Sequence, residues 1–165
     1  MPTNMDRFIV LLAAKEHIME EMAHVLTEEQ SRIMEMNSGA VEESNRRKEE
    51  VSTRLNRAVA ECRQLMEVVG SERGGESGDT LSNLITLASD AERHELVPLQ
   101  RRLLLLAGTL VRQQDLNRKM LVRSMGLIQR SLSLFGGFLG FADTYGAGGR
   151  VSTGSAGVRF LRREI

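Results

Sequence analysis

Apolar residues recur at alternating steps of four and three along the first part of the chain. Nine positions keep this spacing and seven of them are apolar: Phe8, Leu12, Lys15, Met19, Met22, Leu26, Glu29, Ile33 and Met36. A neighbouring row at seven-residue steps, Leu11, Ile18 and Val25, widens the stripe. This spacing is typical of a long amphipathic helix with a coiled-coil-like seam, and it predicts a helix over about 4–36.

The same pattern returns after a short polar break. Seven of the next nine positions at this spacing are apolar: Val41, Ser44, Lys48, Val51, Leu55, Ala58, Cys62, Leu65 and Val69. They predict a second helix over about 40–69. The break, Asn37-Ser38-Gly39, has turn and capping residues, so we expect the two helices to form an antiparallel hairpin.

A glycine-rich stretch, 70–78, separates the hairpin from the rest of the chain. Beyond it the pattern predicts a short helix over about 80–96 and a long one over about 98–139, with Pro98 expected to end the first of them. The prediction is an all-α fold: a long antiparallel hairpin with a third long helix along it, as a three-helix, coiled-coil-like bundle. We expect one helical domain over 1–140 and a flexible, glycine-rich C-terminal tail over 141–165.

The end of the predicted long helix is unusually apolar. One row contains apolar residues only: Leu121, Met125, Ile128, Leu132, Phe135 and Leu139. The adjacent row is apolar at four of its six positions: Met120, Ser124, Leu127, Ser131, Leu134 and Phe138. Two neighbouring rows make a face wider than packing against one hairpin seam requires, which favours a binding surface for another helix.

Charge and composition narrow the class of protein. The 165 residues contain 22 basic and 22 acidic side chains, so the formal net charge is zero. The split is uneven, with a net charge of −6 over residues 1–80 and of +6 over residues 81–165. Because the third long helix should lie along the hairpin, we interpret the split as charge complementarity within the molecule. The basic side chains of that helix are spread around it and aromatic residues are few, so no nucleic-acid partner is predicted.

The sequence has few cysteines, no long apolar stretch and no complete catalytic or metal-binding motif, which limits its expected cellular location and its expected chemistry. A single cysteine, Cys62, excludes an intramolecular disulfide and fits the reducing cytoplasm, and no apolar stretch is long enough for stable membrane insertion. Glu21 and His24 match one half of a carboxylate-protein metal motif, but no second copy exists. Cys62 lies on an apolar row with no histidine nearby in sequence to activate it. We therefore predict no catalytic residues, no metal site, no cofactor and no enzymatic activity.

Two short elements add a resemblance to the helical pattern. Leu116-Asn117-Arg118-Lys119-Met120-Leu121 is followed by Ser131-Leu132, and Tyr145-Gly146-Ala147-Gly148-Gly149 comes after the long helix. Together with the hairpin and its glycine-rich connection, they resemble the FlgN family of flagellar type III export chaperones over roughly residues 5–150. The first element is similar to the family's Asn-x-x-Leu-Leu segment and the second to its tyrosine-containing turn.

The resemblance implies a cytoplasmic chaperone. It would bind the C-terminal amphipathic helix of hook-associated proteins (FlgK and FlgL), keep them unassembled, and deliver them to the export gate or export ATPase components. It also implies that the C-terminal part of the chain binds cargo. This part includes the apolar row, so the expected cargo-binding residues are Leu121, Met125, Ile128, Leu132, Phe135 and Leu139, and we expect the tail to become ordered on binding. Tyr145 would be the residue for docking at the export gate, or else a turn residue packing on the last helix.

Two alternatives remain open from the sequence. The apolar row could pack on the helix predicted over 80–96, or on a second copy in a homodimer. The whole chain could be a self-assembling coiled-coil scaffold, or a helical regulatory adaptor, that uses the same stripes.

Overall fold

The computed structural model describes residues 1–75 and 80–139, and side chains as far as residue 134. It contains four helices in these ranges: α1 (Asn4–Met34), α2 (Ser38–Glu72), α3 (Leu81–Leu87) and α4 (Asp90–Leu139). No strand occurs among the described residues, so the predicted all-α class is confirmed. The predicted tail, 141–165, lies outside them.

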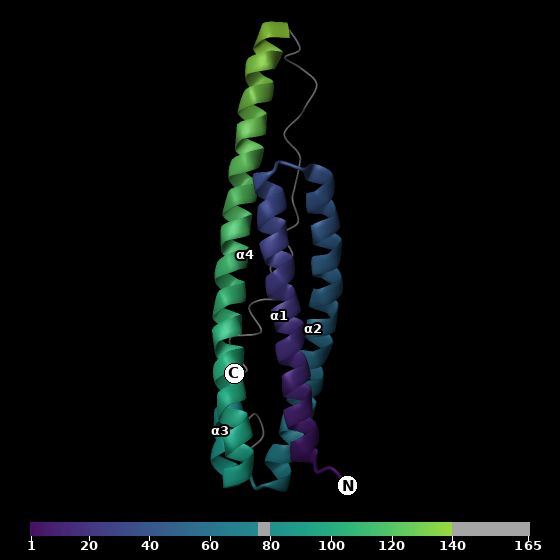
Figure 1. The fold of residues 1–165 in the computed structure, drawn as a ribbon, viewed down its shortest axis with the longest axis vertical. Coiled ribbons are helices and arrows are strands. Elements are labelled where there is room, and N and C mark those ends of the chain that lie inside the picture. Colours follow the sequence, from purple (N-terminus) through teal and green to yellow (C-terminus); the bar gives the residue numbers. More distant parts are fainter. Residues whose placement is uncertain (76–79, 140–165) are drawn as a thin grey trace.

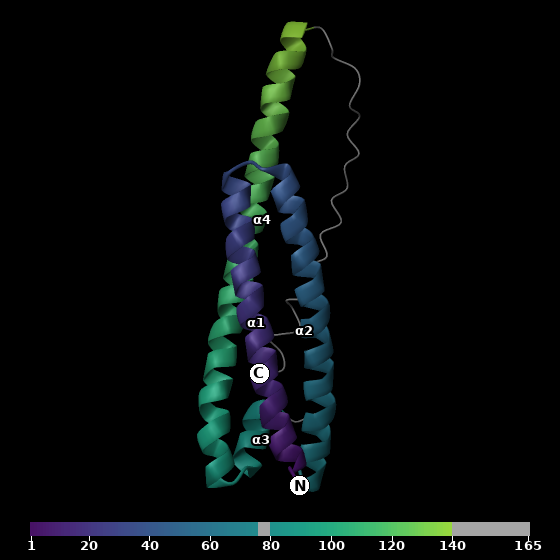
Figure 2. The ribbon, with the colours of Figure 1, turned by 45° about the vertical axis from the view of Figure 1, so that its right-hand side comes forward.

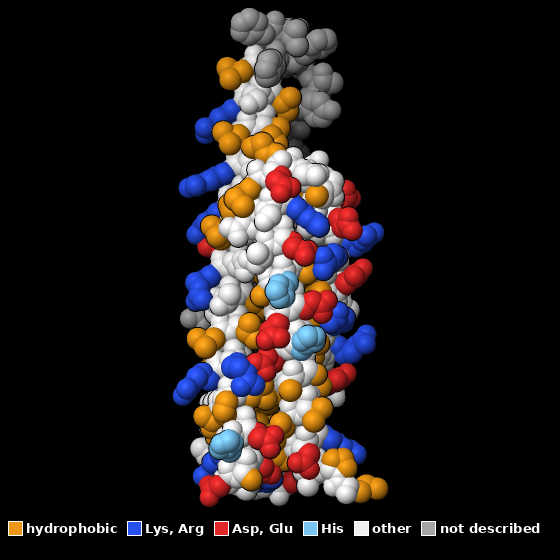
Figure 3. Space-filling view, viewed as in Figure 1, with side chains coloured by type: hydrophobic (Ala, Val, Ile, Leu, Met, Phe, Trp, Pro, Cys, Tyr) orange, Lys and Arg blue, Asp and Glu red, His pale blue; other side chains and the backbone are white. Residues whose placement is uncertain are grey.

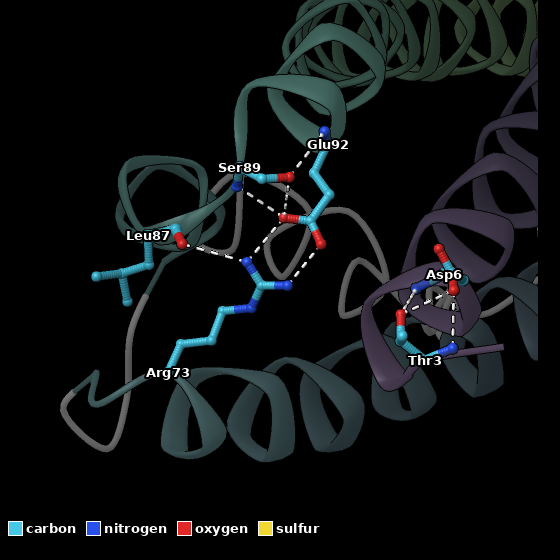
Figure 4. A network of polar contacts seen from close by, with 6 residues as sticks. All are labelled: Thr3, Asp6, Arg73, Leu87, Ser89 and Glu92. Carbon is cyan, nitrogen blue, oxygen red and sulfur yellow. Dashed lines mark hydrogen bonds and ion pairs between the residues drawn. The ribbon is translucent and has the colours of Figure 1, made fainter. Parts of the chain in front are cut away.

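α1 and α2 form an antiparallel hairpin along the length of the bundle (Figure 1). Thr3 and Asp6 start α1 with a capping box, in which the Asp6 carboxylate accepts from the Thr3 backbone N–H at 2.7 Å and the Thr3 hydroxyl accepts from the Asp6 N–H (Figure 4). At the other end, Met36 turns the chain with a φ of 53° and Asn37 caps α2. Arg32 then donates to the Ala40 carbonyl and the Ser44 hydroxyl across the turn. The turn is therefore held by hydrogen bonds from both helices.

α4 lies along α1, and the two helices run in the same direction (Figures 1 and 2). Polar contacts join them at successive levels: Arg102 to Glu16, Gln113 to Thr27 and Asn117 to Glu29. Each pair is separated by 86 to 88 residues along the chain. This nearly constant offset describes the register of α4 against the hairpin.

The helix break predicted at Pro98 is wrong. α3 ends at Leu87, Ala88 adopts an extended backbone with a ψ of 151°, and α4 then runs from Asp90 through Pro98. Ser89 and Glu92 form a capping box that starts α4 at this point. Pro98 removes one helical hydrogen bond, to the carbonyl of His94, but both residues are exposed and water can satisfy that carbonyl. The capping box and the burial of the α4 leucines therefore stabilise the helix by more than Pro98 destabilises it.

A polar network holds the α3–α4 junction to the end of α2 (Figure 4). Arg73, which ends α2, donates to both carboxylate oxygens of Glu92, at 2.7 and 2.5 Å, and to the Leu87 carbonyl. Glu92 also accepts from the Ser89 backbone N–H and hydroxyl. The hydrogen bonds from Arg73 are the main reason that the pKa of Glu92 is lowered to about 2.

We expect Arg73→Ala to lower the free energy of unfolding at neutral pH by about 1 to 2 kcal/mol, because Glu92 loses a bidentate partner. The folded-state pKa of Glu92 lies below its unfolded value near 4.5, so its contribution is present above pH 4.5 and is lost as the pH falls toward 2. Thermal unfolding between pH 7 and pH 2, followed by circular dichroism, should therefore reveal a smaller acid-induced loss in the variant. Equal acid sensitivity in parent and variant would contradict this assignment. Arg118→Ala, at an exposed arginine of α4, is the control.

Among the described residues, one cationic side chain is buried in the core. Lys15 is 3% exposed, and none of the described residues hydrogen-bonds to its ammonium. Burial lowers its pKa, and burial also raises the pKa of the nearby Cys62 thiol to about 11. Both line a cavity of about 10 Å³ with apolar residues and one arginine: Phe8, Leu12, Arg63, Met66, Leu81 and Leu103. Cys62 is therefore a protonated, buried thiol, as expected from its place on an apolar row.

We expect Lys15→Met to raise the free energy of unfolding by about 1 to 3 kcal/mol, because methionine fills similar space without a charge to desolvate. The gain should shrink as the pH rises toward 10.5, since the parent then loses the buried charge. Urea unfolding at pH 7 and at higher pH measures both effects. Lys119→Met, at an exposed lysine paired with Asp115, should change stability by less than about 0.5 kcal/mol. A destabilised Lys15→Met protein would contradict the prediction.

The predicted charge complementarity between hairpin and third helix is wrong for most of the basic side chains. Arg102 pairs with Glu16 of α1. The other basic residues of α4 beyond Pro98 are exposed: Arg101, Arg112, Arg118, Lys119, Arg123 and Arg130. Lys and Arg side chains accordingly line the outer edge of α4 in Figure 3. Three other acidic residues of α1 pair within the hairpin, where Arg47, Lys48 and Arg54 of α2 contact Glu28, Glu29 and Glu21.

Candidate binding surface on the projecting end of α4

α4 continues past the hairpin turn as a single helix (Figures 1 and 2). The contact between Gln30 and Met120 lies close to the end of α1, so we define residues 123–139 as the arm. At 1.5 Å per residue, the arm projects by about 25 Å. None of the other described helices lies beside it (Figures 1 and 2).

The predicted apolar row continues the face by which α4 packs into the bundle. Leu99, Leu110, Leu121 and Leu132 are spaced by eleven residues, close to three helical turns, so they share one side of α4. The first two are 3% and 1% exposed, Leu121 is half-buried, and Leu132 is 64% exposed. The same apolar face is thus covered by the hairpin below the turn and uncovered on the arm.

The described members of the row are arranged as one surface. Met125 and Ile128 are 43% and 49% exposed and lie on the same side of the helix as Leu132. Phe135 and Leu139 belong to α4, but nothing is described of their side chains, and Tyr145 lies outside the described residues. The adjacent row adds Leu127 and Leu134, which are exposed too. Hydrophobic side chains are accordingly visible on the arm in Figure 3.

One of the two alternatives for this row is excluded. α3 lies at the opposite end of the bundle from the arm (Figure 1), and its Leu81 and Leu84 are buried in the main core. The row from Leu121 to Leu132 therefore does not pack on the segment predicted as helix 80–96. No helix of the described part of the chain is long and apolar enough to cross a membrane.

A buried polar layer lies just below the arm, and the sequence interpretation missed it. Asn117 is 2% exposed and donates to Glu29 at 2.9 Å and to the Leu26 carbonyl at 2.7 Å. Glu29, which is 5% exposed, also accepts from Lys48 of α2 at 2.6 Å. The layer therefore joins α1, α2 and α4. The available signal was the pair of polar residues, Lys48 and Glu29, at seam positions of the two hairpin helices.

Comparison with known proteins gives one family. A family model described as FlgN protein matches residues 1–153 of the chain. No curated protein matches the chain, and neither does any solved structure. The matched range includes the whole of the hairpin and α4, and therefore the arm.

Proposed function

Because the chain belongs to the FlgN family, which is a family of flagellar export chaperones and not of enzymes, we propose that its cargo is the hook-associated proteins. In this proposal the chain holds these proteins in the cytoplasm before export. The observation that carries the proposal is the exposed continuation of a core-packing face along the arm. A face built to pack against a helix, and left without one, suits a helical segment of a partner.

The arm supports a helix-in-groove mode of binding. We propose that Leu121, Met125, Ile128 and Leu132 contact one side of an amphipathic helix at the cargo C-terminus, with Phe135 and Leu139 extending the same row. Their spacing of three and four residues matches the anchors of such a contact. Met125 adds an unbranched, adaptable side chain, which suits a chaperone with more than one cargo.

The proposed mechanism is protection followed by delivery. Covering the apolar side of a cargo helix removes the surface through which that helix would associate prematurely. Release requires only that binding be reversible, so no chemical step on the cargo is needed. Tyr145 remains our candidate for contact with the export gate.

Size-exclusion chromatography with light scattering tests this function. The full chain, mixed with a purified hook-associated protein, should form a complex of defined mass at low micromolar concentration. The same cargo without its C-terminal segment should fail to form it. Filaments or large oligomers of the chain alone, growing with concentration and unaffected by cargo, would favour the self-assembling scaffold instead. A stable homodimer that does not bind cargo, and that cargo does not dissociate, would indicate that the arm serves self-association.

A further inference from the structure

The central leucine row of α4 does not by itself define how far the helix slides along the hairpin. Leu96, Leu103 and Leu110 are all buried and stand seven residues apart, so a shift of one heptad replaces leucine by leucine. The facing row of α1 repeats at the same spacing, with five buried apolar residues: Met5, Leu12, Met19, Leu26 and Ile33. Along these two rows alone, several registers give similar burial, whereas the buried Leu99 and Ala107 of α4 do not both have apolar residues seven positions away.

Asn117 breaks this repetition. It follows Leu110 by seven residues, at the next position of the same row, and it binds Glu29 in a buried layer with Lys48. A one-heptad shift would move Asn117 about 10 Å from Glu29, to the level of Met22 or beyond the end of α1. The buried amide and carboxylate would then lose each other as partners, at the full cost of desolvation.

The layer is not arranged for maximal stability. The Asn117 side-chain oxygen is buried and has no hydrogen-bond partner among the described residues. An unsatisfied buried acceptor is destabilising, and an apolar residue would avoid that cost. Buried polar residues in helical seams are known to define register at a cost in stability.

We propose that the Glu29–Asn117–Lys48 layer sets the register of α4 against the hairpin, and therefore how far the arm projects beyond the turn. Asn117 is the positioning residue on α4. The other contacts in the same register, Arg102 with Glu16 and Gln113 with Thr27, each include one exposed side chain, Arg102 and Thr27, and are therefore less shielded from water than the Asn117 layer. The proposal concerns the bundle alone and does not depend on the identity of the cargo.

Distances between two spin labels test the register directly. In a Cys62→Ala background, labels at Arg7→Cys on α1 and Arg112→Cys on α4 occupy exposed positions within the bundle, so bending of the arm does not affect them. The offset of 86 residues places them about 28 Å apart along the axis. The parent should give a single distance peak.

The test variant is Glu29→Leu combined with Asn117→Leu, in which both rows become apolar at this layer. We expect an unchanged or higher unfolding midpoint and a second distance peak displaced by about 10 Å. Glu29→Gln, which keeps the polar contact with Asn117, should retain the single peak. A single parental peak in the leucine variant, or its failure to fold, would overturn the proposal. So would a second peak in Arg73→Ala, because the α3–α4 junction would then define the register.

Discussion

Replacing Ile128 and Leu132 together with aspartate is expected to abolish binding of hook-associated proteins and to leave the bundle folded. Both side chains are anchors in the proposed helix contact, and charges at two anchors that cargo would cover should weaken binding by at least about 100-fold. The bundle should tolerate the change because both residues are about half exposed or more, on the arm beyond the hairpin. Isothermal titration with a hook-associated protein measures binding, and circular dichroism measures helicity.

Matched charges on another side of the same helix provide the control. Gln129 and Ser133 are exposed neighbours of the two anchors but lie off the apolar row. Gln129→Asp with Ser133→Asp adds the same two charges and should keep parental affinity. Parental affinity in the Ile128/Leu132 variant would exclude this row as the binding surface. Equal loss in both variants would point to the charge of the arm instead of its apolar face.

The sequence predicted those features of the fold that depend on local periodicity. The seam from Phe8 to Ile33 is buried as expected, and the row from Leu121 to Leu132 is one side of a helix. Each follows from counting steps of three and four along a helix, which requires no knowledge of neighbours. Whether a row faces a partner or solvent could not be read from its spacing. Leu110 and Leu132 have the same pattern and opposite exposure, because the length of the hairpin decides which is covered.

The errors arose where two local signals compete or where partners are distant in sequence. Pro98 was expected to end a helix, but Ser89 and Glu92 form a stronger start signal nine residues earlier. Charge totals over halves of the chain could not reveal that Arg54 contacts Glu21 within the hairpin. The contact of Asn117 with Glu29 spans 88 residues, and it appears only when α4 is placed in register.

Leu103→Ala is expected to cause the largest loss of stability among single changes in α4, about 2 to 5 kcal/mol. Leu103 is fully buried and already lines the small cavity beside Phe8 and Lys15, so truncation enlarges a void that rigid helices cannot close. Leu105 lies two residues away on the same helix and is 66% exposed. Leu105→Ala makes the same chemical change without a cavity and should alter stability by less than about 0.5 kcal/mol. Urea unfolding of both variants, followed by circular dichroism, gives the comparison.

The difference between these two variants tests whether the face of α4 that is buried in the bundle is the face exposed on the arm. Leu103 and Leu132 lie on the same side of α4, whereas Leu105 lies on the outer side. If Leu103→Ala is destabilised and Leu105→Ala is not, the packing face is the one that continues along the arm. Equal effects would mean that α4 packs through a different side. The row at Ile128 and Leu132 would then no longer be the uncovered part of a packing surface, and the argument for cargo binding there would fail with it.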